Sequence, residues 1–223
     1  MTRVDARDTK GRIVAEAFAL FAERGYRGVS VRDIAAAVGI KDASLYNHFS
    51  GKQAIFDAVV DDAFERTREA FERDGVMFSP EDDPSGYAGA PAETRRRVLA
   101  GFRYFFEDAY MVSLRHLLTI AQFDDEGAAQ AYRLIFIDRP QAIQRSVFEH
   151  LMATGAFERD DAGRLAREFY GPVFLLLSSE IPWTKAQPLI CDHLSHFMAA
   201  HGLGAQVRAA ASTENDTREG DVL

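Results

Sequence analysis

Two short helix signals flank a glycine in residues 25–56, GYRGVSVRDIAAAVGIKDASLYNHFSGKQAIF. Ser30 and Asp33 predict a capping box, in which the hydroxyl and the carboxylate each satisfy a backbone amide at the start of a helix. Gly39 allows a sharp turn, because glycine adopts left-handed backbone angles without steric cost. A third helix over residues 42–49 then completes the outline of a helix-turn-helix motif.

Helix signals continue on both sides of this segment. A first helix is expected over residues 8–24, and Ser50 with Gln53 predicts a second capping box that opens a long helix to about residue 73. Residues 74–91 are rich in Gly, Pro, Asp and Ser and are expected to form a loop. Six more helices are expected at about 92–108, 109–121, 126–138, 140–154, 162–180 and 186–201. No convincing strand pattern is present, so the fold class is all-α.

Charge is unevenly distributed along the 223-residue chain. The net charge is −8, yet residues 1–53 hold nine Lys and Arg against six acids, which is +3, and the rest carries −11. A basic segment on an acidic body is compatible with nucleic-acid binding by that segment. One cysteine, Cys191, allows no intrachain disulfide, and no apolar run approaches the roughly 18 residues of a membrane span, so we expect a cytoplasmic protein without a membrane partner.

Residues 25–56 resemble the signature of the TetR family of transcriptional regulators. The resemblance rests on Gly25-Tyr26 at the end of the first helix, Asp33-Ile34-Ala35 in a capped second helix, and the turn at Gly39. It also rests on Leu45-Tyr46-x-His48-Phe49 followed by Lys52. It covers roughly residues 8–60. It implies a helix-turn-helix DNA-binding head, a helical body that binds an effector, and a homodimer on a palindromic DNA operator, most commonly as a repressor.

The third helix divides its side chains between core and DNA. Leu45 and Phe49 lie one turn apart and are expected to anchor it, so that polar residues face the roughly 12 Å major groove. The expected base contacts are Lys41, Asp42, Ala43, Ser44 and Asn47. The resemblance implies that Tyr46, His48 and Lys52 lie against the DNA backbone, where they position the protein. Ser30 and Arg32 can add phosphate contacts at the start of the second helix.

Many family members carry a small hydroxyl residue where Lys41 stands and a glycine where Ala43 stands. The cap of the third helix must therefore differ here, and Asp42 is the expected cap. A carboxylate at this position is repelled by phosphates but can accept a hydrogen bond from a cytosine amino group.

Aromatic residues are unusually dense between positions 102 and 123. Each is a core residue or part of an apolar ligand pocket, and the core interpretation is favoured for any one residue. The candidates for an apolar or aromatic effector site are Phe102, Tyr104, Phe105, Tyr110, His116, Tyr132 and Trp183. The last two helices are apolar on more than one face, which favours a homodimer through them.

Other function classes leave little trace in the sequence. There is no phosphate loop, dinucleotide glycine pattern or G-x-S-x-G, so no catalytic residue and no cofactor is expected. His193 and His196 with Asp192 could in principle hold a metal, but an apolar helix favours packing, and no metal is expected. An architectural DNA-binding protein without a ligand, and less plausibly an enzyme, stay open. The expected domains are 8–55 for DNA binding, 56–202 for effector binding and dimerisation, and a disordered tail, 203–223.

Overall fold

The computed structural model describes residues 6–202, and the tail expected at 203–223 lies outside these residues. Helices make up most of residues 6–202, and there is no β-strand in that range. Phe157 and Gly202 pair in one isolated antiparallel β-bridge. The all-α prediction is confirmed. The helices are α1 (Ala6–Arg24), α2 (Val31–Val38), α3 (Asp42–Leu45), α4 (Lys52–Asp74), α5 (Pro91–Glu107), α6 (Ala109–Ala121), α7 (Glu126–Arg133), α8 (Arg139–Ala153), α9 (Ala162–Ser178) and α10 (Trp183–His201). A 3₁₀ turn, η1 (Pro84–Tyr87), interrupts the expected loop, and a π-helical turn, η2 (Leu134–Asp138), joins α7 to α8.

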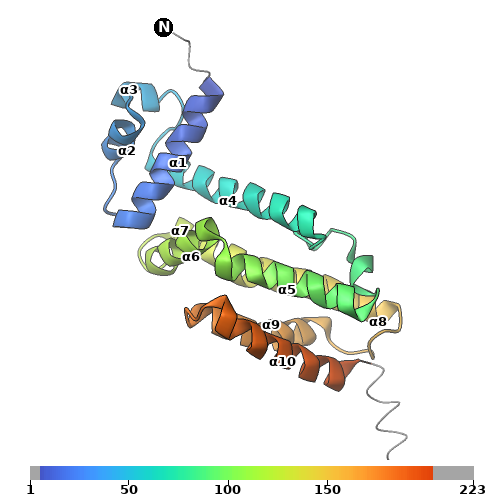
Figure 1. Cartoon of the computed structure of the whole chain (residues 1–223). Coiled ribbons are helices and arrows are strands. Elements are labelled where there is room, and N and C mark those ends of the chain that lie inside the picture. The colour runs from blue at the N-terminus through green and yellow to red at the C-terminus, as the bar shows by residue number, and fades with distance from the viewer. Residues whose placement is uncertain (1–5, 203–223) are drawn as a thin grey trace, which may run out of the picture. The chain divides into compact units, whose positions relative to one another are not determined.

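The chain divides into two compact units. The first comprises residues 1–70 and 108–135, and the second comprises residues 71–107 and 136–223, as far as they are described. The first unit therefore contains α1 to α3, most of α4, α6 and α7 (Figure 1). The segment expected as a DNA-binding domain, 8–55, lies inside this larger unit.

The core of the first unit is built from one apolar side chain per helix turn. Ile13, Phe21, Ile34, Leu45 and Phe56 are almost completely buried, so α1, α2, α3 and α4 meet around them. Burial of each such side chain stabilises the fold by about 1.5–3 kcal/mol, far more than the helix propensity of so short a segment as α3. Tertiary packing therefore holds the two short helices in place.

The third helix is shorter than expected. Regular α-helical geometry ends at Leu45, and the chain reaches Phe49 through turns, in which the amides of Asn47 and His48 bond to carbonyls three residues back. Asp42 is the first helical residue and not the cap; Lys41 occupies the cap position without a side-chain hydrogen bond. The helix thus lacks the capping bond that would favour a longer regular helix.

The expected capping box at Ser50 and Gln53 does not form. The Gln53 side chain instead accepts a hydrogen bond from the Tyr26 hydroxyl at 2.8 Å and donates one to Asp57 Oδ1 at 2.9 Å. Helix α4 begins only at Lys52, so Gln53 lies too close to its start to act as the third helical residue. The hydrogen bond with Tyr26, which lies far away in the sequence, takes the place of the expected bond with Ser50.

In the second unit, aromatic rings form the contact between α8, α9 and α10. Phe148 lies 5.5 Å from Phe169 and 5.4 Å from Phe197, measured between ring centroids, and all three rings are buried. Trp183 and Ile190 of α10 extend the same core. Edge and tilted ring arrangements of this kind add to the burial of their large surfaces.

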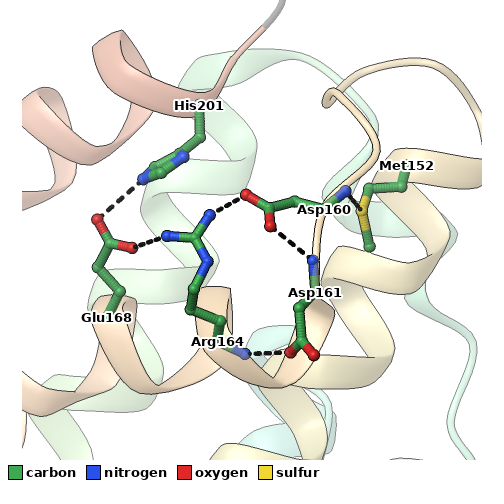
Figure 2. Close-up of polar contacts among 6 residues, drawn as sticks. All are labelled: Met152, Asp160, Asp161, Arg164, Glu168 and His201. Atoms are coloured by element: carbon green, nitrogen blue, oxygen red, sulfur yellow. Dashed lines mark hydrogen bonds and ion pairs between the residues drawn. The ribbon is translucent and has the colours of Figure 1, made fainter.

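Charged residues tie the end of α10 to the start of α9 (Figure 2). Arg164 contacts both Asp160 and Glu168, and Glu168 Oε1 lies 3.0 Å from His201 Nε2. Asp161 caps α9 by accepting a hydrogen bond from the Arg164 amide at 2.6 Å. This network links the last residue of α10 to the first turns of α9.

Candidate nucleic-acid interface

The α2–α3 turn has the geometry that its sequence predicts. The Asp33 amide donates to Ser30 Oγ at 3.2 Å, and the Ser30 amide donates to Asp33 Oδ2 at 2.8 Å, which completes the capping box. The Ser30 hydroxyl also donates to Asp33 Oδ2, and this bond, together with the one from the Ser30 amide, holds the pKa of the Asp33 carboxyl below its ordinary value. Gly39 closes α2 with φ of 76°, and the next amide, at Ile40, bonds back to Ala35 O at 3.0 Å.

The expected base contacts lie on one accessible segment. Lys41, Asp42, Ala43 and Asn47 are exposed, and Ser44 is half-buried. Leu45 and Phe49 are buried beneath them, as the spacing predicts. The segment can therefore offer ammonium, carboxylate, hydroxyl and amide groups to base edges while its apolar side is anchored in the head.

Arg32 and Asp42 form an ion pair between α2 and α3. Arg32 Nε lies 3.3 Å from Asp42 Oδ2, and both side chains are largely exposed. The guanidinium offsets the carboxylate charge that would otherwise face the phosphates. Asp42 can keep a role in base recognition with less repulsion from the DNA backbone than its sequence position suggests.

The three residues expected at the DNA backbone differ in their surroundings. Tyr46 is 57% exposed and His48 is half-buried. Lys52 Nζ donates to the carbonyls of Tyr26 at 3.0 Å and Val29 at 3.1 Å and lies 4.2 Å from the centroid of the Tyr26 ring. Two of its three N–H groups thus hold the loop before α2, and one remains for a phosphate.

The head is anchored to α6 within the first unit. Phe18 of α1 stacks on Tyr110 with 4.0 Å between ring centroids, and the Tyr110 hydroxyl donates to Val59 O at 3.1 Å. Arg27 pairs with Asp124 at 3.3 Å. No local sequence signal predicts these contacts, because Phe18 and Arg27 meet partners that lie far away along the chain.

The expected effector residues are not gathered at one cavity. Tyr110, His116 and Tyr132 belong to the first unit, whereas Phe102, Tyr104, Phe105 and Trp183 belong to the second. Phe102 and Trp183 are buried core residues, and Tyr104 and Phe105 pack edge-on against Phe71. None of the seven lines the largely apolar cavity of about 380 Å³ that the second unit contains.

Neither metal binding nor membrane insertion finds support in the described part of the chain. Within residues 6–202, no three His, Cys, Asp or Glu side chains are grouped as metal ligands would be. His193 instead contacts Phe169 O at 2.9 Å, and His196 lies beside Asp192 on the same helix. No helix in that range is both long and apolar enough to cross a membrane.

These features define a helix-turn-helix head on a helical body. Residues 13–59 match the sequence model of the bacterial regulatory proteins of the tetR family. The N-terminal segment is therefore similar to the helix-turn-helix segment of this family.

Similar proteins agree with this assignment. The HTH-type transcriptional repressor KstR2 of Rhodococcus jostii is 43% identical over 79 residues, which are 31% of this chain and 39% of that protein. The regulator IcaR of Staphylococcus aureus is 45% identical over 56 residues, 25% of this chain and 30% of that protein. The chain thus matches less than half the length of these relatives.

Solved structures extend the similarity of fold to most of the chain. A TetR family regulator from Pseudomonas syringae superposes with a TM-score of 0.66 and 17% identity over 89% of this chain and 100% of that one. The flavonoid-responsive regulator FrrA superposes with a TM-score of 0.65 and 21% identity over 89% and 99%. At these identities the comparison establishes the fold alone.

Proposed function

We propose that the protein is a ligand-responsive transcriptional repressor that binds a palindromic DNA operator in the cytoplasm as a homodimer. The DNA-binding role rests on one observation. Lys41, Asp42, Ala43 and Asn47 are exposed on a segment that follows the turn at Gly39 and is anchored by the buried Leu45. A short anchored helix of this kind can enter a major groove and read base edges.

Dimerisation is supported by apolar side chains that α9 and α10 leave uncovered. Leu175 is 66% exposed and Leu189 is 53% exposed, whereas other apolar residues of the same helices are buried. A second copy can cover both through a self-complementary contact, and two heads can then meet successive major grooves about 34–36 Å apart.

Ligand response is supported by the cavity in the second unit. A purely architectural DNA-binding protein has no use for an apolar cavity of about 380 Å³, which falls in the range of small-molecule sites. Helix α4 begins in the DNA-binding head and runs without interruption to Asp74, so it is one covalent path along which the ligand state can change the heads.

The test begins with the DNA that adjoins the coding region. An inverted repeat there is expected to bind the protein as one dimer, with affinity that falls steeply as salt rises. A compound that raises the melting temperature is expected to change operator affinity about 5- to 150-fold, and operator DNA must change the affinity for the compound by the same factor. Equal compound affinities with and without operator would refute the regulatory coupling, and absence of binding to any such repeat would refute the DNA-binding role.

A further inference from the structure

The walls of the 380 Å³ cavity are aromatic and aliphatic. It lies within the second unit, where α8, α9 and α10 contribute Phe148, Leu151, Phe169 and Leu194, and the loop between α8 and α9 adds Phe157. Each of these five side chains is less than a tenth exposed. The cavity therefore offers dry apolar surface to the body of a ligand, since such surface favours transfer of apolar groups out of water.

One positive charge stands among the residues that line the cavity. Arg95 is the charged member of the lining, which contains no carboxylate. Its neighbours Arg96 and Arg97 on α5 share the carboxylate of Glu93, at 2.7 Å and 3.1 Å. Arg95 itself has no hydrogen bond or ion pair with any residue between 6 and 202 and is exposed to solvent.

A second polar group in the lining is also unoccupied. Gln144 of α8 is half-buried, and its side-chain amide makes no hydrogen bond to any described residue. The other three uncharged polar side chains of the lining have partners. Thr94 donates to Tyr87 O at 3.3 Å, Ser195 donates to Cys191 O at 2.8 Å, and the Tyr87 hydroxyl accepts from the Met77 amide at 3.2 Å. The Gln144 amide is therefore free to donate a hydrogen bond to a ligand in the cavity.

From these contacts we infer that the cavity binds an amphipathic monoanion, an apolar carboxylate whose body fills the aromatic interior and whose carboxylate meets Arg95 and Gln144. The guanidinium fork matches the two oxygens of a carboxylate, and the Gln144 amide supplies a further donor. Because Arg95 is the one cation in the lining, the cavity favours a ligand with a single negative charge over a nucleotide or a polyphosphate. This inference rests on the proposed ligand response and names the ligand class for it.

The experiment compares acids with their neutral alcohols. Titration calorimetry on the full chain measures decanoate against decan-1-ol and biphenyl-4-carboxylate against biphenyl-4-methanol. At least one acid is expected to bind about tenfold more tightly than its alcohol. Arg95→Gln is expected to remove that preference while it leaves affinity for the alcohol unchanged, and Gln144→Leu is expected to reduce the preference in part.

Three controls locate the site. Arg103→Gln removes an exposed arginine on the same helix that pairs with Glu107 away from the cavity, and it should leave every affinity unchanged. Ser195→Trp places a large side chain at the exposed edge of the cavity and should abolish binding of acid and alcohol alike. Circular dichroism melting of each variant confirms that it folds.

Several outcomes would overturn the inference. They are no binding of either acid, equal binding of acid and alcohol, or binding that Ser195→Trp leaves intact. Binding that arises only in a chain ending at Gly202 would mean that segment 203–223 occupies the cavity in the whole protein, which also overturns it. Acid binding that depends on Arg95 but does not change operator affinity would uphold the site and refute the proposed regulation.

Discussion

Two lysines at the proposed DNA surface have opposite surroundings. Lys41 is exposed at the start of α3, whereas Lys52 is half-buried and bonded to the carbonyls of Tyr26 and Val29. A charge that also satisfies backbone carbonyls is part of the folded structure of the head. The two positions therefore separate stability from DNA recognition.

We predict that Lys52→Met lowers the free energy of unfolding by about 1–3 kcal/mol, because two carbonyls lose a charged donor. The same change should lower the magnitude of the salt slope of DNA binding by about one unit through loss of a phosphate contact. Urea denaturation and binding at several salt concentrations measure the two effects. Unchanged stability would contradict the structural role.

The matched change Lys41→Met should leave the free energy of unfolding within about 0.5 kcal/mol, as is usual for an exposed position. It should alter which base is tolerated at one position of each half-site, with a loss of about 1–3 kcal/mol of discrimination. Competition binding with single-base operator variants measures this. A uniform loss across all sequences would move Lys41 to the group of residues that only position the DNA.

Glu93 gives α5 a pH-dependent contribution. Hydrogen bonds from Arg96 and Arg97 lower the pKa of its carboxyl from 4.5 to about 2. Because the folded-state pKa is depressed, the contribution is present above about pH 4.5 and is lost as the pH falls toward 2. We expect Glu93→Gln to lower the melting temperature slightly at pH 6, and less at pH 3 or in high salt, since the group is exposed. If the difference in melting temperature between Glu93→Gln and the unchanged protein grows as the pH falls, the predicted direction is wrong.

At the scale of elements, Gly39 connects α2 to α3 with φ of 76°, and a Cβ at this position would meet no atom within 4 Å. Gly39→Ala therefore tests backbone strain alone and should cost about 1–2 kcal/mol of stability. Gly11→Ala is the control, because Gly11 lies inside α1 with equally open space around it. It should stabilise the protein by up to about 1 kcal/mol. Chemical denaturation of both variants checks the prediction, which fails if the two changes have the same sign.

At the scale of the whole molecule, the proposed dimer depends on exposed apolar residues of α9 and α10. Leu176 packs partly against the core, so Leu175, which is 66% exposed, is the sharper test. Leu175→Glu should yield a monomer at micromolar concentration in sedimentation, because it would leave a carboxylate unpaired in an apolar interface. Ile120→Glu alters an equally exposed residue of α6 and should leave the dimer intact. A dimer that survives Leu175→Glu would place the interface elsewhere.

Local signals in the sequence determined the helical architecture and the position of the exposed segment 41–47. Ser30, Asp33 and Gly39 act on their own backbone neighbours, and Leu45 and Phe49 follow from helical spacing, so a single chain segment contains all the information they need. Helix limits were predicted to within about three residues except at two places. These are the end of α3, which has no side-chain cap, and the α7–α8 junction, where the π-helical turn η2 follows α7.

Tertiary structure alone decided which side chains meet. Lys52 and Gln53 both bond to Tyr26, and Tyr110 bonds to Val59, more than 20 residues away in sequence in each case. The cavity is lined from four helices and the loops between them. An aromatic stripe has the same periodicity whether it fills a core or lines a pocket, so the predicted effector residues and the residues of the cavity could not be told apart. Arg95 and Gln144 carry no periodic signal at all, and they gain meaning only because the fold leaves both without a partner beside an apolar space.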